Sequence, residues 1–92
     1  MDLLSPKAMA TAKRNLAIRI ERLLHRQGDF TGWQADQVLA AIEAMQEERF
    51  DDGERIIMKA ERPDLWEPAG YVASGRNDAA QLIALLEKAA AD

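Results

Sequence analysis

Residues 5–28 read SPKAMATAKRNLAIRIERLLHRQG, and this stretch decides the fold class. Ser5 followed by Pro6 is a helix start signal, because a serine hydroxyl can accept a hydrogen bond from a first-turn amide and proline fits the first helical position. Gly28 offers the left-handed conformation that ends many helices. One arc of the helical wheel collects the apolar side chains of Met9, Ala12, Leu16, Ile20, Leu23 and Leu24. The stretch therefore predicts a long two-faced helix that runs to about Gln27.

A second helix is predicted from Thr31 to about Glu48. Thr31 and Gln34 have the spacing of a capping box, in which each side chain satisfies a free backbone amide near the other residue. The apolar side chains of this segment also fall on one face: Ala35, Val38, Leu39, Ile42 and Met45.

A third, shorter helix is expected to follow, with Asp51 or Asp52 as its cap and Pro63 as its end. Phe50 is expected to fill the corner between the second and third helices. The buried edge of the third helix is predicted to consist of Ile56, Ile57 and Ala60.

Proline, glycine and serine interrupt the pattern between residues 62 and 77, where one helical turn is expected around Trp66 to Val72. Asn77 or Asp78 is then expected to cap a fourth helix. Its apolar face is predicted to contain Leu82, Leu85, Leu86 and Ala89.

These elements predict an all-α protein: one domain over residues 1–92, built as a small orthogonal or bundle-like array of three main helices and a short additional one. The second and third helices should form an antiparallel hairpin, and the spacing of Phe50, Gly53, Ala60 and Pro63 loosely resembles half of a tetratricopeptide repeat. That resemblance implies a manner of packing and no function, because a single hairpin is below the number that such arrays need. The predicted core consists of Leu16, Ile20, Leu23, Val38, Ile42, Met45, Ile56, Leu82 and Leu86.

Composition limits the setting and the partners. The 92 residues include 48% hydrophobic and 30% charged residues and no cysteine, which is typical of a globular chain in a reducing, cytoplasmic environment. The net charge of −4 is unevenly distributed, since residues 1–28 carry +4 and residues 29–92 carry −8. Such asymmetry fits either a basic arm for nucleic acid or a complementary protein surface.

Residue types that perform catalysis are scarce. His25 is the one histidine, and it is expected on the polar side of the first helix. Ser5 and Ser74 fall at an expected cap and an expected turn, so no Ser-His pair is indicated. The acidic run from Glu47 to Glu54 lacks the spacing of a calcium loop. The sequence thus predicts a protein that is not an enzyme and that has no metal site, no cofactor and no small-molecule substrate.

The surface of the first helix is the most suggestive feature for binding. Arg14, Arg19 and Arg22 lie away from its apolar arc, and Ile18 projects among them. A helix that is longer than its neighbours is also expected to leave apolar surface uncovered, including Leu24 at its end. A basic helix face of this kind can lie along phosphates, which makes nucleic acid an alternative partner.

Trp33, Trp66 and Tyr71 flank the expected loops, where they either close the core or serve as interface anchors. Together, these features predict a small, non-catalytic protein-interaction module of bacterial type, an adaptor or inhibitor that homodimerises or docks on a larger protein. A nucleic-acid-binding regulator is the alternative. The residues predicted to bind the partner are Arg14, Ile18, Arg19, Arg22, Leu24, Trp66 and Tyr71.

Overall fold

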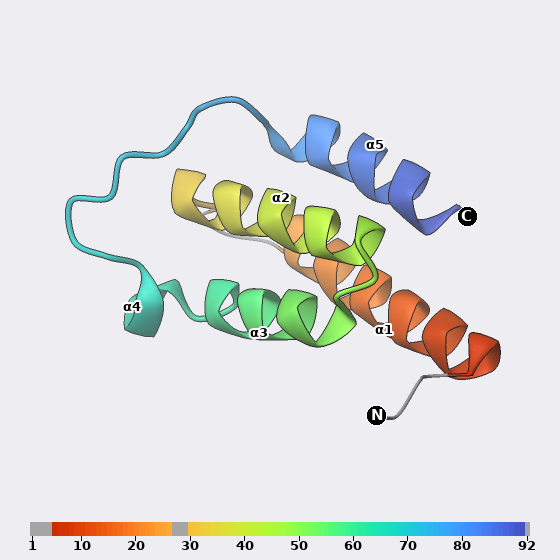
Figure 1. Ribbon diagram of the computed structural model, residues 1–92. Coiled ribbons are helices and arrows are strands. Elements are labelled where there is room, and N and C mark those ends of the chain that lie inside the picture. Colours follow the sequence, from red (N-terminus) through yellow and green to blue (C-terminus); the bar gives the residue numbers. More distant parts are fainter. Residues whose placement is uncertain (1–4, 27–29, 92) are drawn as a thin grey trace.

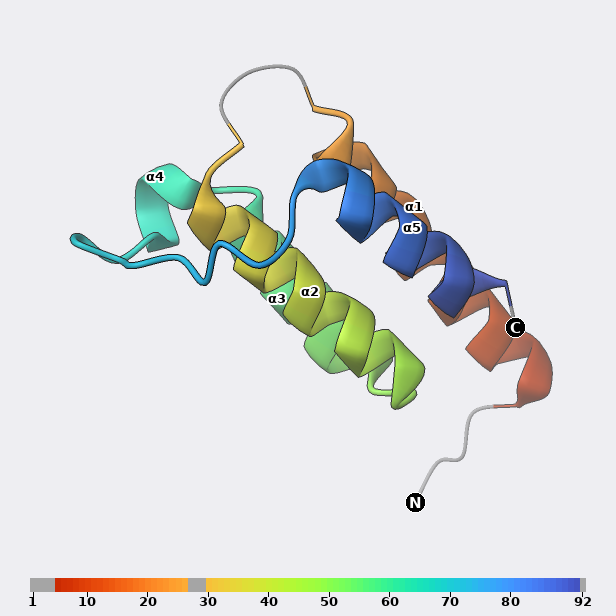
Figure 2. The same cartoon turned by 90° about the horizontal axis from the view of Figure 1, so that it is seen from above.

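The computed structural model describes residues 5–26 and 30–91, and within these ranges it contains helices and no strand. The helices are α1 (Pro6–Leu24), α2 (Gly32–Gln46), α3 (Phe50–Ala60), the single turn α4 (Pro63–Trp66) and α5 (Ala79–Ala90). Helices α2 and α3 form the expected antiparallel hairpin, and α5 runs antiparallel to α1 along its side (Figures 1 and 2). The prediction of a small all-α array is confirmed.

Three helices begin where the sequence predicts, because their caps are local. The Ser5 hydroxyl accepts a hydrogen bond from the Ala8 amide over 3.1 Å at the start of α1. Thr31 and Gln34 form the predicted capping box of α2, and Asp78 forms a second capping box with Gln81 at the start of α5.

Other predicted boundaries are wrong. Helix α3 begins at Phe50, before both aspartates that were expected to cap it, and its N-cap residue Arg49 makes no side-chain cap. The helical turn expected around Trp66 to Val72 lies earlier, at Pro63–Trp66, because Pro63 begins a helix there. Helix α1 ends at Leu24 with His25 as its cap; the predicted end at Gln27 and Gly28 lies outside the described residues.

The corner between α2 and α3 explains the early start of α3. Glu48 adopts a left-handed conformation with φ of 60°, and the Glu48 amide donates to the Met45 carbonyl. The Arg49 amide donates to the Ala44 carbonyl over 2.8 Å. This pair of bonds is a Schellman motif, which ends α2 and reverses the chain with glutamate in the place that glycine commonly takes.

The core lies where α1, the α2–α3 hairpin and α5 meet. Of the predicted core residues, all are buried except Ile56, which is half-buried at the edge of α3. Gln34 is buried as well, and its side chain donates to the Ala60 carbonyl over 2.9 Å while accepting from the Thr31 amide. This residue therefore fastens the start of α2 to the end of α3 without an unpaired polar atom.

Candidate functional site

The most apolar exposed part of the described surface is the segment 65–72, which includes the end of α4 and the chain that follows it. The exposed fractions of Leu65, Trp66, Tyr71 and Val72 are 63%, 52%, 39% and 88%. Across residues 5–26 and 30–91, only two other large apolar side chains are as exposed, Ile18 and Met58. We call residues 65–72 the apolar segment.

Charged groups border this segment. The guanidinium of Arg62 bonds both carboxylate oxygens of Asp64, at 3.1 and 2.8 Å, just before Leu65. The ammonium of Lys59 lies 4.9 Å from the centre of the Trp66 ring, a cation–π distance that ties α4 to α3. The hydrogen bond from Arg62 lowers the pKa of Asp64 below its ordinary value.

The chain after α4 is fastened across the start of α2. The Asp36 carboxylate accepts hydrogen bonds from the Tyr71 hydroxyl over 2.6 Å, from the Ser74 amide over 3.0 Å and from the Ser74 hydroxyl. The Thr31 hydroxyl donates to the Glu67 carboxylate over 2.9 Å. Residues 67–74 are therefore held on α2, although they form no helix.

These contacts perturb two ionisable groups. The hydrogen bonds from Ser74 and Tyr71 lower the pKa of Asp36, because they stabilise its charged form. The hydrogen bond between Tyr71 and Asp36 also raises the pKa of Tyr71, because the tyrosine hydroxyl must keep its proton to donate.

The aromatic residues that the sequence left open are now assigned. Trp33 is 6% exposed and belongs to the interior, whereas Trp66 and Tyr71 are exposed in the apolar segment. The sequence contains no local signal for this difference, because it depends on the path of the chain after α4.

The predicted partner-binding residues of α1 divide into two groups. Leu24 is 8% exposed and packs in the core, so its side chain is not on the surface. Arg19 bonds Glu61 through Nε and Nη2, at 3.0 and 2.9 Å, and Glu54 through Nη1 at 3.0 Å. Its hydrogen bond to Glu61 raises the pKa of Arg19, and the side chain fastens α1 to α3. Arg14, Ile18 and Arg22 remain on the outer face of α1.

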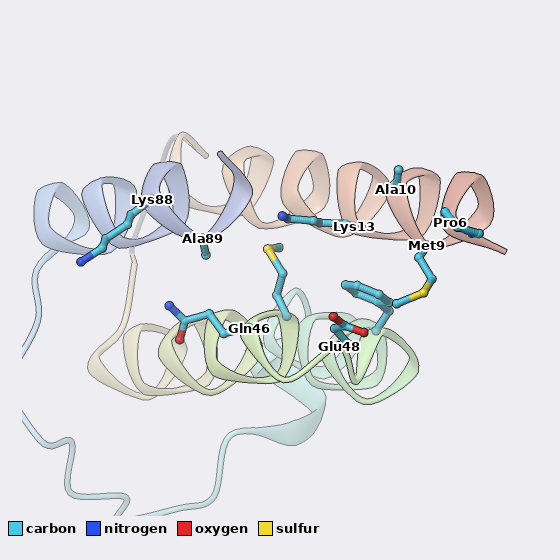
Figure 3. A pocket seen from close by; sticks show the side chains of 10 residues that line it. Pro6, Met9, Ala10, Lys13, Gln46, Glu48, Lys88 and Ala89 are labelled. Atoms are coloured by element: carbon cyan, nitrogen blue, oxygen red, sulfur yellow. The ribbon is translucent and has the colours of Figure 1, made fainter. Parts of the chain in front are cut away.

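A groove that the sequence did not predict lies where the start of α1, the end of α2 and the end of α5 approach one another. Figure 3 shows Met9 and Lys13 of α1 with Ala89 of α5 on one side and Gln46 on the other. The groove has a volume of about 530 Å³, and its floor includes Met45 and Phe50. Its lining comes from separate elements, so no sequence pattern could have brought these residues together.

Groups that hold metals do not gather in the described ranges. There, no three side chains of histidine, cysteine, aspartate or glutamate come together in a way that could hold a metal ion. His25 is exposed at the end of α1.

None of the helices in the part of the chain that the structure describes is both long and apolar enough to cross a membrane. No family model, no curated protein and no solved structure matches this chain.

Proposed function

We propose that the protein is a non-catalytic interaction module, an adaptor or inhibitor, which docks on a larger protein through the apolar segment. A cytoplasmic setting belongs to this proposal, and the absence of cysteine supports it. One observation carries the proposal: four of the six large apolar side chains exposed in the described ranges lie within eight consecutive residues. Scattered apolar residues are ordinary on a protein surface, but a cluster of them is typical of a binding site.

The residue types of the segment fit a docking role. Tryptophan and tyrosine contribute more to binding energy than other residues at protein interfaces, and they act best inside a polar rim. Trp66 and Tyr71 supply the aromatic groups, and the Arg62–Asp64 pair with Lys59 supplies the charges around them.

The fastening of the segment supports the same role. A loop that becomes ordered only on binding loses conformational entropy at that moment, which weakens the complex. The bonds from Tyr71 and Ser74 to Asp36 order this segment before any partner arrives. Affinity should therefore benefit from a surface that is already in place.

Docking on a different protein suits the position of the segment better than homodimerisation. Both views show α4 and the chain after it at one end of the molecule (Figures 1 and 2). A copy that received this end elsewhere on its surface would make a head-to-tail contact, which tends to form open chains, so the closed dimer open to this segment is a two-fold pairing with itself. We propose a groove of a larger protein as the acceptor, with a monomer in isolation as the expected state.

The test compares immobilised wild-type protein with the Leu65→Ser/Trp66→Ala variant in a lysate of the source organism. We expect one protein to be retained by the wild type and to be depleted about tenfold or more on the variant, because hot-spot side chains contribute on the order of 2 kcal/mol each. Quantitative mass spectrometry measures the retained proteins. Met58→Ser is the matched control, since Met58 is equally exposed outside the segment.

Two outcomes would contradict the proposal. In the first, the wild type and both variants retain the same proteins, which would mean that the apolar segment binds no partner. Sedimentation over a concentration series would show a doubling of mass, lost in Leu65→Ser/Trp66→Ala, if the segment served homodimerisation. Circular dichroism verifies that each variant keeps its helices.

A further inference from the structure

The outer face of α1 carries a row of exposed side chains. Lys7, Thr11, Arg14, Ile18, Arg22 and His25 recur at intervals of three and four residues, and all are exposed. They lie opposite the buried side of α1, which includes Leu16, Ile20 and Leu23. We call these six residues the outer stripe. At 1.5 Å per residue the stripe is about 27 Å long.

The cations of this stripe have no carboxylate partner among the described residues, in contrast to four arginines elsewhere in the protein. Arg49 and Arg55 form ion pairs with Asp52 of α3, and Arg62 forms one with Asp64 at the start of α4. Arg19 bonds Glu54 of α3 and Glu61, the C-cap residue of that helix. Lys7, Arg14 and Arg22 form no ion pair or side-chain hydrogen bond with any residue that the structure describes. Three cations without an ion pair to the described residues thus lie along one helix face, although the chain has a net charge of −4.

We infer that the outer stripe is a second docking surface and that it receives an acidic amphipathic helix of a partner protein. Ile18 lies at the middle of the stripe, is 45% exposed, and offers one apolar contact between Arg14 and Arg22. The axes of two packed helices lie roughly 8–10 Å apart. At that distance an apolar side chain of the partner helix can cover Ile18. The long arginine side chains can then reach carboxylates on either side of that contact.

A second copy of this chain fits the stripe poorly. An antiparallel pair of α1 helices centred on Ile18 would bring Arg14 of each copy opposite Arg22 of the other. A parallel two-fold pair would bring each arginine opposite itself. Both arrangements place like charges together, which is unfavourable at an interface.

Nucleic acid fits less well than an acidic helix. Residues 29–92 carry a charge of −8, which repels a long polyanion that extends past α1 more than a short peptide that covers only the outer stripe. Glu21 is exposed beside Arg14 and Arg22 on the same helix, and Ile18 has no phosphate to contact. A partner helix needs only a short acidic strip next to one apolar residue, and the stripe offers that pattern.

The test uses a fluorescein-labelled peptide of about 20 residues as the probe. The peptide carries leucine at its centre, glutamate three and four residues to either side, and alanine and glutamine elsewhere. Fluorescence anisotropy at about 50 mM salt should give a Kd in the tens of micromolar, weakened severalfold at about 300 mM salt, because salt screens exposed charges. Arg14→Glu/Arg22→Glu should weaken binding about tenfold or more, and Ile18→Ser about fivefold.

The matched control is Arg76→Glu/Lys88→Glu, which changes the net charge by the same amount on exposed side chains outside α1. It should change the Kd less than about twofold. Equal weakening in both double variants, or no effect of Ile18→Ser, would overturn the inference, since general charge attraction would then explain the binding. Tighter binding of a DNA duplex than of the peptide would replace the partner with nucleic acid.

Self-association that Arg14→Glu/Arg22→Glu abolishes would assign the stripe to a second copy and would also overturn the inference. The two docking surfaces can fail separately. Leu65→Ser/Trp66→Ala should leave the affinity for the acidic peptide unchanged, while the α1 variants should still retain the protein that binds the apolar segment.

Discussion

Asp36 holds the chain after α4 with a single carboxylate. Three hydrogen bonds converge on it, and their donors lie 35 to 38 positions later in the sequence. Because these bonds lower the pKa of Asp36, their contribution to stability is present above the ordinary value of 3.8 and is lost as the pH falls below it. The order of the apolar segment should therefore decrease in acid.

Tyr71 gives a direct measurement of this bond, since it is the one tyrosine of the chain. The absorbance change on phenolate formation should have its midpoint above 10.0 in the wild type, because the bond to Asp36 raises the pKa of Tyr71. Asp36→Asn removes the negative acceptor and should move that midpoint down toward 10.0. An alkaline titration followed near 295 nm measures both values.

Glu67→Gln is the control, because it removes a nearby negative charge that bonds Thr31 and not Tyr71. Its midpoint should match the wild type. A midpoint unchanged by Asp36→Asn would mean that the bond between Tyr71 and Asp36 is absent in solution.

At this scale the sequence predicted little of the site. It singled out Trp66 and Tyr71 as residue types that bind partners, and both are exposed. It could not pair Tyr71 with Asp36, since a long-range hydrogen bond leaves no periodic pattern. It also grouped Arg19 with Arg14 and Arg22, because helix periodicity alone does not reveal which neighbouring helix supplies carboxylates.

Helices α1, α2 and α3 meet at Gly53. A β-carbon at this position would lie 2.5 Å from Cδ2 of Leu16 and 3.5 Å from the Ala41 carbonyl oxygen. Leu16 is fully buried, so its side chain would have to shift within the core to make room. Close packing, rather than a turn, therefore favours glycine at this position near the start of α3.

We expect Gly53→Ala to destabilise the protein by about 1–2 kcal/mol. Alanine favours a helix over glycine by about 1 kcal/mol, but overpacking a filled core costs about 1–3 kcal/mol and here involves a main contact of α1 with α3. Urea unfolding measures the change in the free energy of unfolding.

A double-mutant cycle with Leu16→Ala separates the two effects. In the Leu16→Ala background the added methyl group has space, so Gly53→Ala should become neutral or stabilising. Equal destabilisation in both backgrounds would contradict the steric explanation.

The predictability of each helix boundary depended on its chemistry. Ser5, Thr31 and Asp78 were recognisable because a cap and its amide are within three residues of each other. The start of α3 was not, since the Schellman motif at Glu48 fixes it and glutamate is an uncommon residue for that position. Asp51 and Asp52 stabilise the first turn of α3 through the helix dipole. Acidic residues are common both in the first turn and at the N-cap, so the sequence predicted them as caps.

Helix α5 packs between α1 and the α2–α3 hairpin and connects them. It contacts both α1 and α2, which contact each other less than either contacts α5. Leu82 and Leu86 enter the core from this helix, with exposed fractions of 0% and 4%. The apolar period of residues 79–90 predicted which face is buried, but not that this face would close the gap between two other helices.

We expect Leu82→Ala to lower the free energy of unfolding by about 2–5 kcal/mol, the usual cost of a large cavity in a core. A domain of this size is stable by only about 5–14 kcal/mol, so the loss is a large share of the total. Leu85→Ala, at a half-buried position of the same helix, should cost clearly less. Urea unfolding compares them, and equal effects would mean that α5 does not dock as described.

The pairing of α1 with α5 has a consequence for biosynthesis. A ribosome makes α1 before α5, with the residues of α2, α3 and the chain after α4 in between. The apolar side of α1 that α5 packs against therefore stays exposed until residues 79–90 have been made. During that interval a chaperone that recognises apolar helix faces would bind this side of α1, and it would lose its target when residues 79–90 leave the exit tunnel.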